Sequence, residues 1–160
     1  MDPSLNQSSE PFSERFFDDF AVGQKFSSGT ATVTAERIKS FAAEFDPQPF
    51  HLDEAAAQNS LFAGLAASGW HTAAIAMRLF VESDLHPAGG TIGAGVEDLR
   101  WPKPVRPGDV LHLEGEVIEA RASRSRPDLG IVKIRATVYN QRNEPVQIWT
   151  PALMVRRRRA

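Results

Sequence analysis

The chain has 160 residues, a length that fits one domain with a substantial core. Its formal net charge of −2 gives no basic excess for nucleic acid, and no apolar run approaches the roughly 20 residues of a membrane span. Cysteine is absent, which excludes disulfides, thiolate nucleophiles and cysteine metal sites, and the N-terminus does not resemble a signal peptide. We therefore expect a cytoplasmic protein without nucleic-acid or membrane partners.

The first regular elements that the sequence predicts are a strand over residues 26–34 and an amphipathic helix after it. Before them, residues 1–14 are polar and without periodicity, so we expect a disordered N-terminal segment. Thr34 is a typical helix N-cap, and apolar side chains then recur at helical spacing. These are Ile38, Phe41, Ala42 and Phe45. The helix is expected to lead directly into Asp46.

The segment after this helix is the most informative part of the chain, because it places a carboxylate and an imidazole five residues apart. It reads Asp46-Pro47-Gln48-Pro49-Phe50-His51. The prolines lack a backbone N–H and push the residues before them toward extended geometry, so we expect a stiff, non-helical loop. A carboxylate and an imidazole on such a loop can act as general acid and base. The alternative is a plain turn before a short helix at residues 53–58.

The next predicted helix begins after Ser68, a suitable N-cap, and runs to about Val81. From Ala73 onward it has almost no polar face, with Arg78 as the exception. A helix that is apolar all round belongs inside a core. We therefore expect a buried central helix.

The rest of the sequence predicts strands, at residues 95–101, 110–122, 131–140 and 146–155. Short links containing Pro, Gly, Asp or Asn separate the later strands and favour antiparallel pairing. Apolar and polar side chains alternate over residues 132–139, as in a strand with one face on the core. We expect an α+β fold with one long helix under one curved antiparallel sheet, followed by a basic C-terminal tail at residues 156–160.

The order of these elements and three sequence blocks resemble the MaoC-like dehydratases, whose best-described members are (R)-specific enoyl-CoA hydratases with the hot-dog fold. Residues 46–51 are similar to the family signature Asp-x-Asn-Pro-x-His, with Gln48 in place of Asn. Residues 65–69 resemble the segment that leads into the family's central helix, and residues 95–109 resemble the next strand and its Pro-Gly-Asp turn. The resemblance implies a single hot-dog domain over residues 15–155. Its departures, Gln48 and the pair Glu44-Phe45 before the signature, bear on substrate choice.

The resemblance implies an enzyme of the hydro-lyase class that adds water reversibly to a 2-enoyl thioester of coenzyme A or an acyl carrier. No cofactor and no metal are implied. Asp46 and His51 would share one water as acid and base, and which of them is the base stays open. The backbone N–H of Gly69, at the start of the long helix, would form the oxyanion hole. The plain alternative for Gly69 is close packing after a good cap.

Several further residues are candidates for substrate binding. Ser68 has two possible roles, capping and contact with the thioester, of which capping is favoured. Aromatic side chains near the helix either line an acyl pocket or fill space, and cations near residue 103 either meet phosphates or are solvated charge. The candidates are Gln48, Phe50, Ser68, Trp70, Lys103 and Arg106, with Phe62 as a further aromatic residue.

The other histidines are interpreted differently from His51. We expect His71 to be a hydrogen-bonded core or pocket-wall residue. His86 precedes a proline in a loop, and His112 lies on a strand. None of the four histidines has a partner at metal-ligand spacing.

Two other functions remain open, and an assembly is expected. A hot-dog acyl-CoA thioesterase would use a similar pocket, but the signature histidine argues against it. A non-catalytic acyl-CoA binding module would not need Asp46 and His51 together. Because a single hot-dog layer leaves strand edges uncovered, we expect a homodimer or a multiple of it, with continuous sheets and a pocket between subunits, as in relatives.

Overall fold

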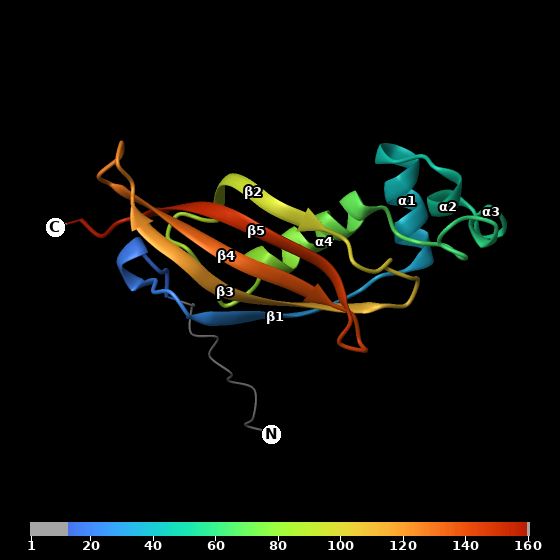
Figure 1. Ribbon diagram of the computed structural model, residues 1–160, viewed down its shortest axis with the longest axis horizontal. Coiled ribbons are helices and arrows are strands. Elements are labelled where there is room, and N and C mark those ends of the chain that lie inside the picture. The colour runs from blue at the N-terminus through green and yellow to red at the C-terminus, as the bar shows by residue number, and fades with distance from the viewer. Residues whose placement is uncertain (1–12, 160) are drawn as a thin grey trace, which may run out of the picture.

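The computed structural model describes residues 13–159, so the expected disorder of residues 1–14 falls almost wholly outside the described part. Five antiparallel strands form one curved sheet in the order β1-β3-β4-β5-β2 (Figure 1). The elements are the 3₁₀ helix η1 (Phe17–Asp19), β1 (Lys25–Thr32), α1 (Ala35–Phe45), α2 (Pro49–Leu52), α3 (Glu54–Gln58), α4 (Gly69–Val81), β2 (Ile92–Arg100), β3 (Val110–Ala122), β4 (Leu129–Tyr139) and β5 (Pro145–Arg156).

The long helix α4 lies along one face of the sheet, and α1, α2 and α3 gather at one end of it (Figure 1). The ring of Phe80 on α4 packs against Phe26 of β1 and Trp149 of β5, at centroid distances of 5.9 and 6.0 Å. The apolar side chains of β4 alternate toward this core and are fully buried, namely Val132, Ile134, Ala136 and Val138. The expected α+β architecture, with one long helix under one antiparallel sheet, is confirmed.

Three helix starts follow the same local rule. Thr34 caps α1 by accepting a hydrogen bond from the N–H of Arg37, and Ser68 caps α4 through the N–H of Trp70. Asp53 caps α3 in the same way. A side-chain oxygen at the N-cap satisfies one of the N–H groups that a first turn leaves unpaired. The cap positions predicted for α1 and α4 are therefore confirmed, and the predicted first strand ends at Thr32 instead of running into its cap.

The prediction that residues 46–51 are non-helical is wrong for their second half. Pro49 is the first residue of α2, a single turn that carries His51, while Gln48 before it has extended backbone angles. Proline is well tolerated at this position, because the first N–H of a helix has no intrahelical partner and the ring already holds a helical φ. The segment is therefore stiff, as expected, but it presents the imidazole from a helical turn.

The prediction of a helix buried on all sides also needs correction. On α4, the side chains of Trp70, Met77 and Val81 are between 45% and 60% exposed, and next to them on β2 Ile92 and Val96 are as exposed. The sheet covers only one face of the helix, and nothing else in the described chain covers the other apolar face. None of the described helices is long and apolar enough to cross a membrane.

The basic tail is partly attached to the domain. Arg156 is the last residue of β5. The guanidinium of Arg158 donates to both carboxylate oxygens of Asp19, at 2.8 and 2.6 Å, and its backbone N–H bonds to Asp18. The tail is therefore held against η1 up to this residue.

Candidate active site

The imidazole of His51 is held by the backbone. His51 lies on α2 and is 4% exposed. Its Nδ1 is 2.6 Å from the carbonyl oxygen of Ala66, on the segment that leads into α4. Since a carbonyl can only accept, Nδ1 must carry a proton and donate it. In the neutral ring this leaves Nε2 unprotonated and free to exchange a proton.

The carboxylate of Asp46 faces that free nitrogen. Asp46 ends α1, with its N–H bonded to the carbonyl of Ala42. Its Oδ2 lies 3.4 Å from Nε2 of His51, and its Oδ1 accepts from the side-chain amide of Gln48 at 2.5 Å. The 3.4 Å separation is longer than an ordinary hydrogen bond. One oxygen atom beside the pair, at hydrogen-bond distance from both, could therefore be acted on by both groups.

The hydroxyl of Ser68 joins this pair. Ser68 is fully buried, and its Oγ accepts from the N–H of Trp70 at 3.2 Å. A hydrogen bond from the same side chain is the main reason why the pKa of Asp46 is lowered, followed by Gln48 and the nearby His51, while burial opposes the shift. A hydroxyl can accept one bond and donate another, so Ser68 caps α4, as favoured from the sequence, and also bonds to Asp46, while its contact with a thioester stays a prediction. Asp46 is thus a carboxylate at neutral pH.

Gly69 lies under the indole ring of Trp101. A Cβ added at Gly69 would be 2.8, 2.9 and 3.0 Å from ring atoms of Trp101. The ring is anchored, because its Nε1 donates to Oε1 of the buried Gln147 at 2.9 Å. Close packing therefore requires glycine here. Sequence reasoning missed Trp101 as a site residue, because the contact spans the chain from α4 to the end of β2.

A cavity of about 310 Å³ adjoins these groups. Its walls include His51, Phe62, Gly69, Thr72, Trp101 and Lys103. Phe50 is not on this wall but packs edge-on against His51 and close to Phe62, with centroid distances of 4.6 and 5.1 Å. Trp70 lies edge-on to Trp101 at 5.3 Å and is otherwise exposed. Phe50 thus supports the imidazole, and Trp70 borders the apolar outer face of α4.

The two cations expected to meet phosphates have protein partners. Lys103 forms an ion pair with Glu144. The guanidinium of Arg106 donates to the carbonyls of Phe62, Gly64 and Leu65, and so fastens the loop before α4 to the segment before β3. Arg106 therefore has a structural function, while the phosphate contact predicted for both cations stays a prediction.

His71 and His112 have aromatic partners of their own. His71 is 7% exposed and stacks on Phe41 at 4.8 Å, and its Nδ1 has no hydrogen-bond partner within residues 13–159. The expectation of a hydrogen-bonded core histidine is therefore wrong for that atom, whereas its place in a cavity wall is confirmed. His112 stacks on Tyr139. In the described chain, no three His, Asp or Glu side chains converge as metal ligands do.

Comparison with known proteins relates this site to one family. The family model described as MaoC like domain matches residues 19–140. An uncharacterized protein of Bacillus subtilis strain 168, YdeM, is 35% identical over 129 residues, covering 81% of this chain and 90% of that protein.

Two solved structures extend this similarity. The MaoC-like dehydratase from Rhodospirillum rubrum is 57% identical with a TM-score of 0.87, over 91% of this chain and 99% of that one. The unliganded R-hydratase PhaJ1 from Pseudomonas aeruginosa is 29% identical with a TM-score of 0.71, over 89% of this chain and 86% of that one. The hot-dog fold that the resemblance implied is thereby confirmed.

Proposed function

The chain belongs to the MaoC-like domain family, and on this premise we propose that it is a hydratase or dehydratase that adds water reversibly to the double bond of a 2-enoyl thioester. The dehydratase and R-hydratase among the similar structures support this class of reaction. The observation that carries the proposal is the pair itself: a charged Asp46 and the free Nε2 of His51, 3.4 Å apart, beside the first turn of α4.

The proton transfers follow from the state of each group. In hydration, the water oxygen bonds to C3, the electrons of the double bond move toward the thioester oxygen, and C2 then takes a proton. Because the lowered pKa of Asp46 makes its carboxylate a weak base, we infer that the proton from water passes to Nε2 of His51, and that the imidazolium returns a proton to C2. Asp46 orients the water and stabilises the imidazolium. Positioned acid and base groups of this kind contribute about 10²–10⁴-fold to the rate.

The first turn of α4 supplies the stabilisation of the enolate oxygen. Trp70 gives its N–H to Ser68, whereas the N–H of Gly69 has no hydrogen-bond partner in the described structure. It lies at the positive end of a 13-residue helix, where negative charge is favoured. A donor of this kind is worth roughly 10²–10³-fold in turnover. Trp101 above Gly69 excludes water from one side.

We also propose that two copies assemble through the exposed apolar face of α4 and β2. Strand β2 is at the edge of the sheet and pairs only with β5, so its outer N–H and C=O groups have no strand partner among residues 13–159. Met77 and Val96, one from each element, line the same small hollow beside this edge. Pairing β2 with β2 of a second copy would continue the sheet and bury the apolar face.

One assay tests the proposed reaction against its rivals. The protein is incubated with 2-enoyl-CoA esters of several chain lengths, and the loss of the conjugated enone is followed together with the release of free thiol. Loss of the enone without thiol is the expected result. Thiol release would instead identify a thioesterase, and saturable binding without either change would identify a binding module. Asp46→Asn and His51→Ala are the test variants, with His112→Gln as a control for replacing a histidine outside the site.

A further inference from the structure

Gln48 lies between the two members of the acid–base pair along the chain and is bonded to both of them. Its backbone N–H donates to the carbonyl of Asp46 at 2.8 Å, which closes a three-residue turn around Pro47. Its own carbonyl accepts from the backbone N–H of His51 at 3.0 Å, in the single turn of α2. Because proline fixes its own φ, little freedom is left in this turn. The backbone link from Asp46 to His51 therefore depends on Gln48.

The side chain of Gln48 adds a further bond, to the carboxylate of Asp46. Its Nε2 donates to Oδ1 at 2.5 Å, a short bond of the charge-assisted kind. With Oδ1 engaged, the carboxylate does not turn freely, and Oδ2 lies 3.4 Å from Nε2 of His51. Ser68 contributes most to the lowered pKa of Asp46 and Gln48 adds to it, because both bonds favour the charged form. His51 is the titratable group that faces this carboxylate, whereas Gln48 and Ser68 do not titrate.

The length of the glutamine side chain decides what its amide contacts. Gln48 is the N-cap residue of α2, yet its side chain does not cap the helix. Asparagine, which the family signature has at this position, is a favoured N-cap residue, because its short side chain reaches an N–H of the first turn. Glutamine has one more methylene, and its amide turns back to Asp46. The longer side chain thus binds the carboxylate and leaves the helix start without a side-chain cap.

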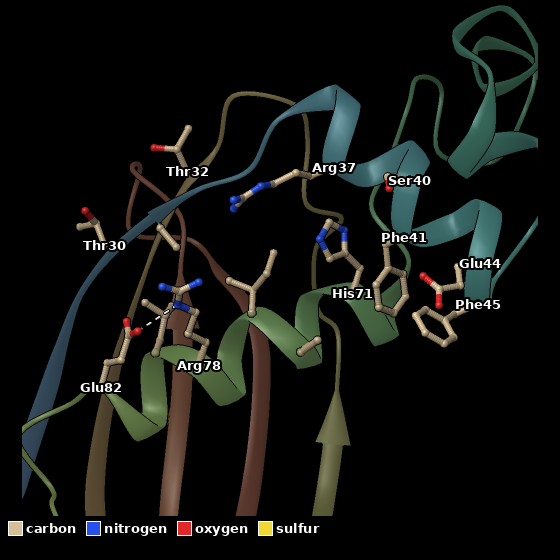
Figure 2. A pocket seen from close by; sticks show the side chains of 14 residues that line it. Thr30, Thr32, Arg37, Ser40, Phe41, Glu44, Phe45, His71, Arg78 and Glu82 are labelled. Atoms are coloured by element: carbon tan, nitrogen blue, oxygen red, sulfur yellow. Dashed lines mark hydrogen bonds and ion pairs between the residues drawn. The ribbon is translucent and has the colours of Figure 1, made fainter.

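Two other roles for this side chain are a solvated surface amide and a substrate contact. Gln48 is exposed, and water competes with hydrogen bonds at a surface. The side chain of Asp46 is only 18% exposed, however, so the accepting carboxylate is largely shielded. Gln48 lines neither the cavity of about 310 Å³ nor the larger one, of about 630 Å³, between β1, α1 and α4 (Figure 2). The substrate contact predicted for Gln48 stays a prediction, and it differs from a role through Asp46 in its effect on KM.

We propose that Gln48 is a positioning residue, whose amide holds the carboxylate of Asp46 with Oδ2 toward His51, and that this contact requires the length of glutamine. This inference rests on the proposed hydratase function. In that reaction the carboxylate orients the water and stabilises the imidazolium, and both effects depend on which oxygen faces Nε2 of His51. Gln48 therefore acts through Asp46 and not through the reacting atoms.

Replacing Gln48 by asparagine separates positioning from structure, because the shorter amide loses its reach to Oδ1 but can cap α2. Gln48→Met keeps the length and removes the donor. Both variants should lower kcat for a 2-enoyl-CoA ester by about 3–10-fold, as for the loss of one hydrogen bond, with KM within about twofold. The midpoint of urea unfolding should be unchanged or higher in Gln48→Asn. The matched control is Gln58→Asn, the same change in an exposed amide that has no hydrogen-bond partner among residues 13–159, and it should alter neither constant.

Titration of Asp46 by ¹³C NMR of its carboxyl carbon, assigned with Asp46→Asn, needs no turnover and separates this inference from the proposed reaction. Because the bond from Gln48 favours the charged form, its loss in Gln48→Asn and Gln48→Met should raise the pKa of Asp46 toward its ordinary value, whereas Gln58→Asn should not. If the wild type consumes no enone but this rise is seen, the hydratase function fails while the contact with Asp46 stands.

Two results would overturn the inference. An unchanged pKa of Asp46 in both Gln48 variants would refute the contact. An unchanged kcat in both would refute the positioning role, and a rise in KM alone would identify a substrate contact in its place.

Discussion

Replacing Gly69 by alanine tests the geometry around the start of α4 most directly. The added Cβ would lie 2.8 Å from the nearest ring atom of Trp101, whereas ordinary contact begins near 3.4 Å, so the ring must move by about 0.6 Å. The ring cannot move freely, because its Nε1 is bonded to the buried Gln147. The substitution therefore strains either the packing or this hydrogen bond.

The size of the effect follows from these two contacts. Overpacking of a filled site costs about 1–3 kcal/mol, and a buried amide that loses its partner costs a similar amount. Alanine is in itself the better helix former, by up to about 1 kcal/mol. We therefore expect Gly69→Ala to lower the free energy of unfolding by about 1–3 kcal/mol. Turnover should fall by at least about 10-fold, because the same Cβ crowds the approach to the Gly69 N–H.

A double-mutant cycle measures the coupling between the two residues. Unfolding by urea is followed at one fixed protein concentration for the wild type, Gly69→Ala, Trp101→Leu and the double variant, since the stability of an oligomer depends on concentration. With the ring removed, Gly69→Ala should become neutral or slightly stabilising. If its cost is the same with and without the Trp101 ring, the contact is not the reason for glycine at this position.

Three further predictions concern the pair and the assembly. Asp46→Asn and His51→Ala should each lower turnover by at least about 10²-fold with an unchanged circular dichroism spectrum, and near wild-type hydration by either would disprove the acid–base assignment. Ser68→Ala should raise the lowered pKa of Asp46 toward its ordinary value, measured by ¹³C NMR of the carboxyl carbon. The stability that the wild-type Asp46 carboxylate contributes is fully present above about pH 4 and is lost as the pH falls through the lower pKa of the folded state. Ser68→Ala should therefore be less stable than the wild type at neutral pH, and the difference in free energy of unfolding should shrink in acid. Light scattering at dilute, near-physiological conditions should report a dimer or a multiple of it. Met77→Glu should dissociate this assembly, whereas Val22→Glu, which replaces another exposed apolar side chain outside α4 and β2, should not. A stable, fully active wild-type monomer would contradict the pairing through β2.

Features that depend on neighbours in the chain were predictable from the sequence. The caps at Thr34 and Ser68 follow from a side-chain oxygen that reaches an N–H two or three residues ahead. The buried face of β4 follows from strict alternation of apolar side chains. Where a local rule permits two outcomes, as for Pro49, which suits both an extended segment and a first helical position, the interpretation failed.

Features that join distant parts of the chain could not be predicted. The indole of Trp101 covers Gly69, and Arg106 binds carbonyls that lie more than 40 residues before it. No periodicity or cap rule carries such information, because it arises only when α4 is placed on the sheet. The same holds for the cavity that Arg37 of α1 and His71 of α4 both line, because it forms only when the two helices are packed together.

The bond from His51 to the carbonyl of Ala66 has a consequence for how this protein can change during evolution. Where a side-chain carboxylate orients a catalytic histidine, a single codon change can remove that carboxylate. A backbone carbonyl is present whichever amino acid is encoded, so position 66 is limited by the space available to a fully buried side chain and not by its chemistry. The surrounding pocket can therefore diverge by single substitutions while the imidazole keeps its tautomer. For protein engineering, this makes the cavity walls suitable for randomisation and leaves the 65–67 backbone as the part to preserve.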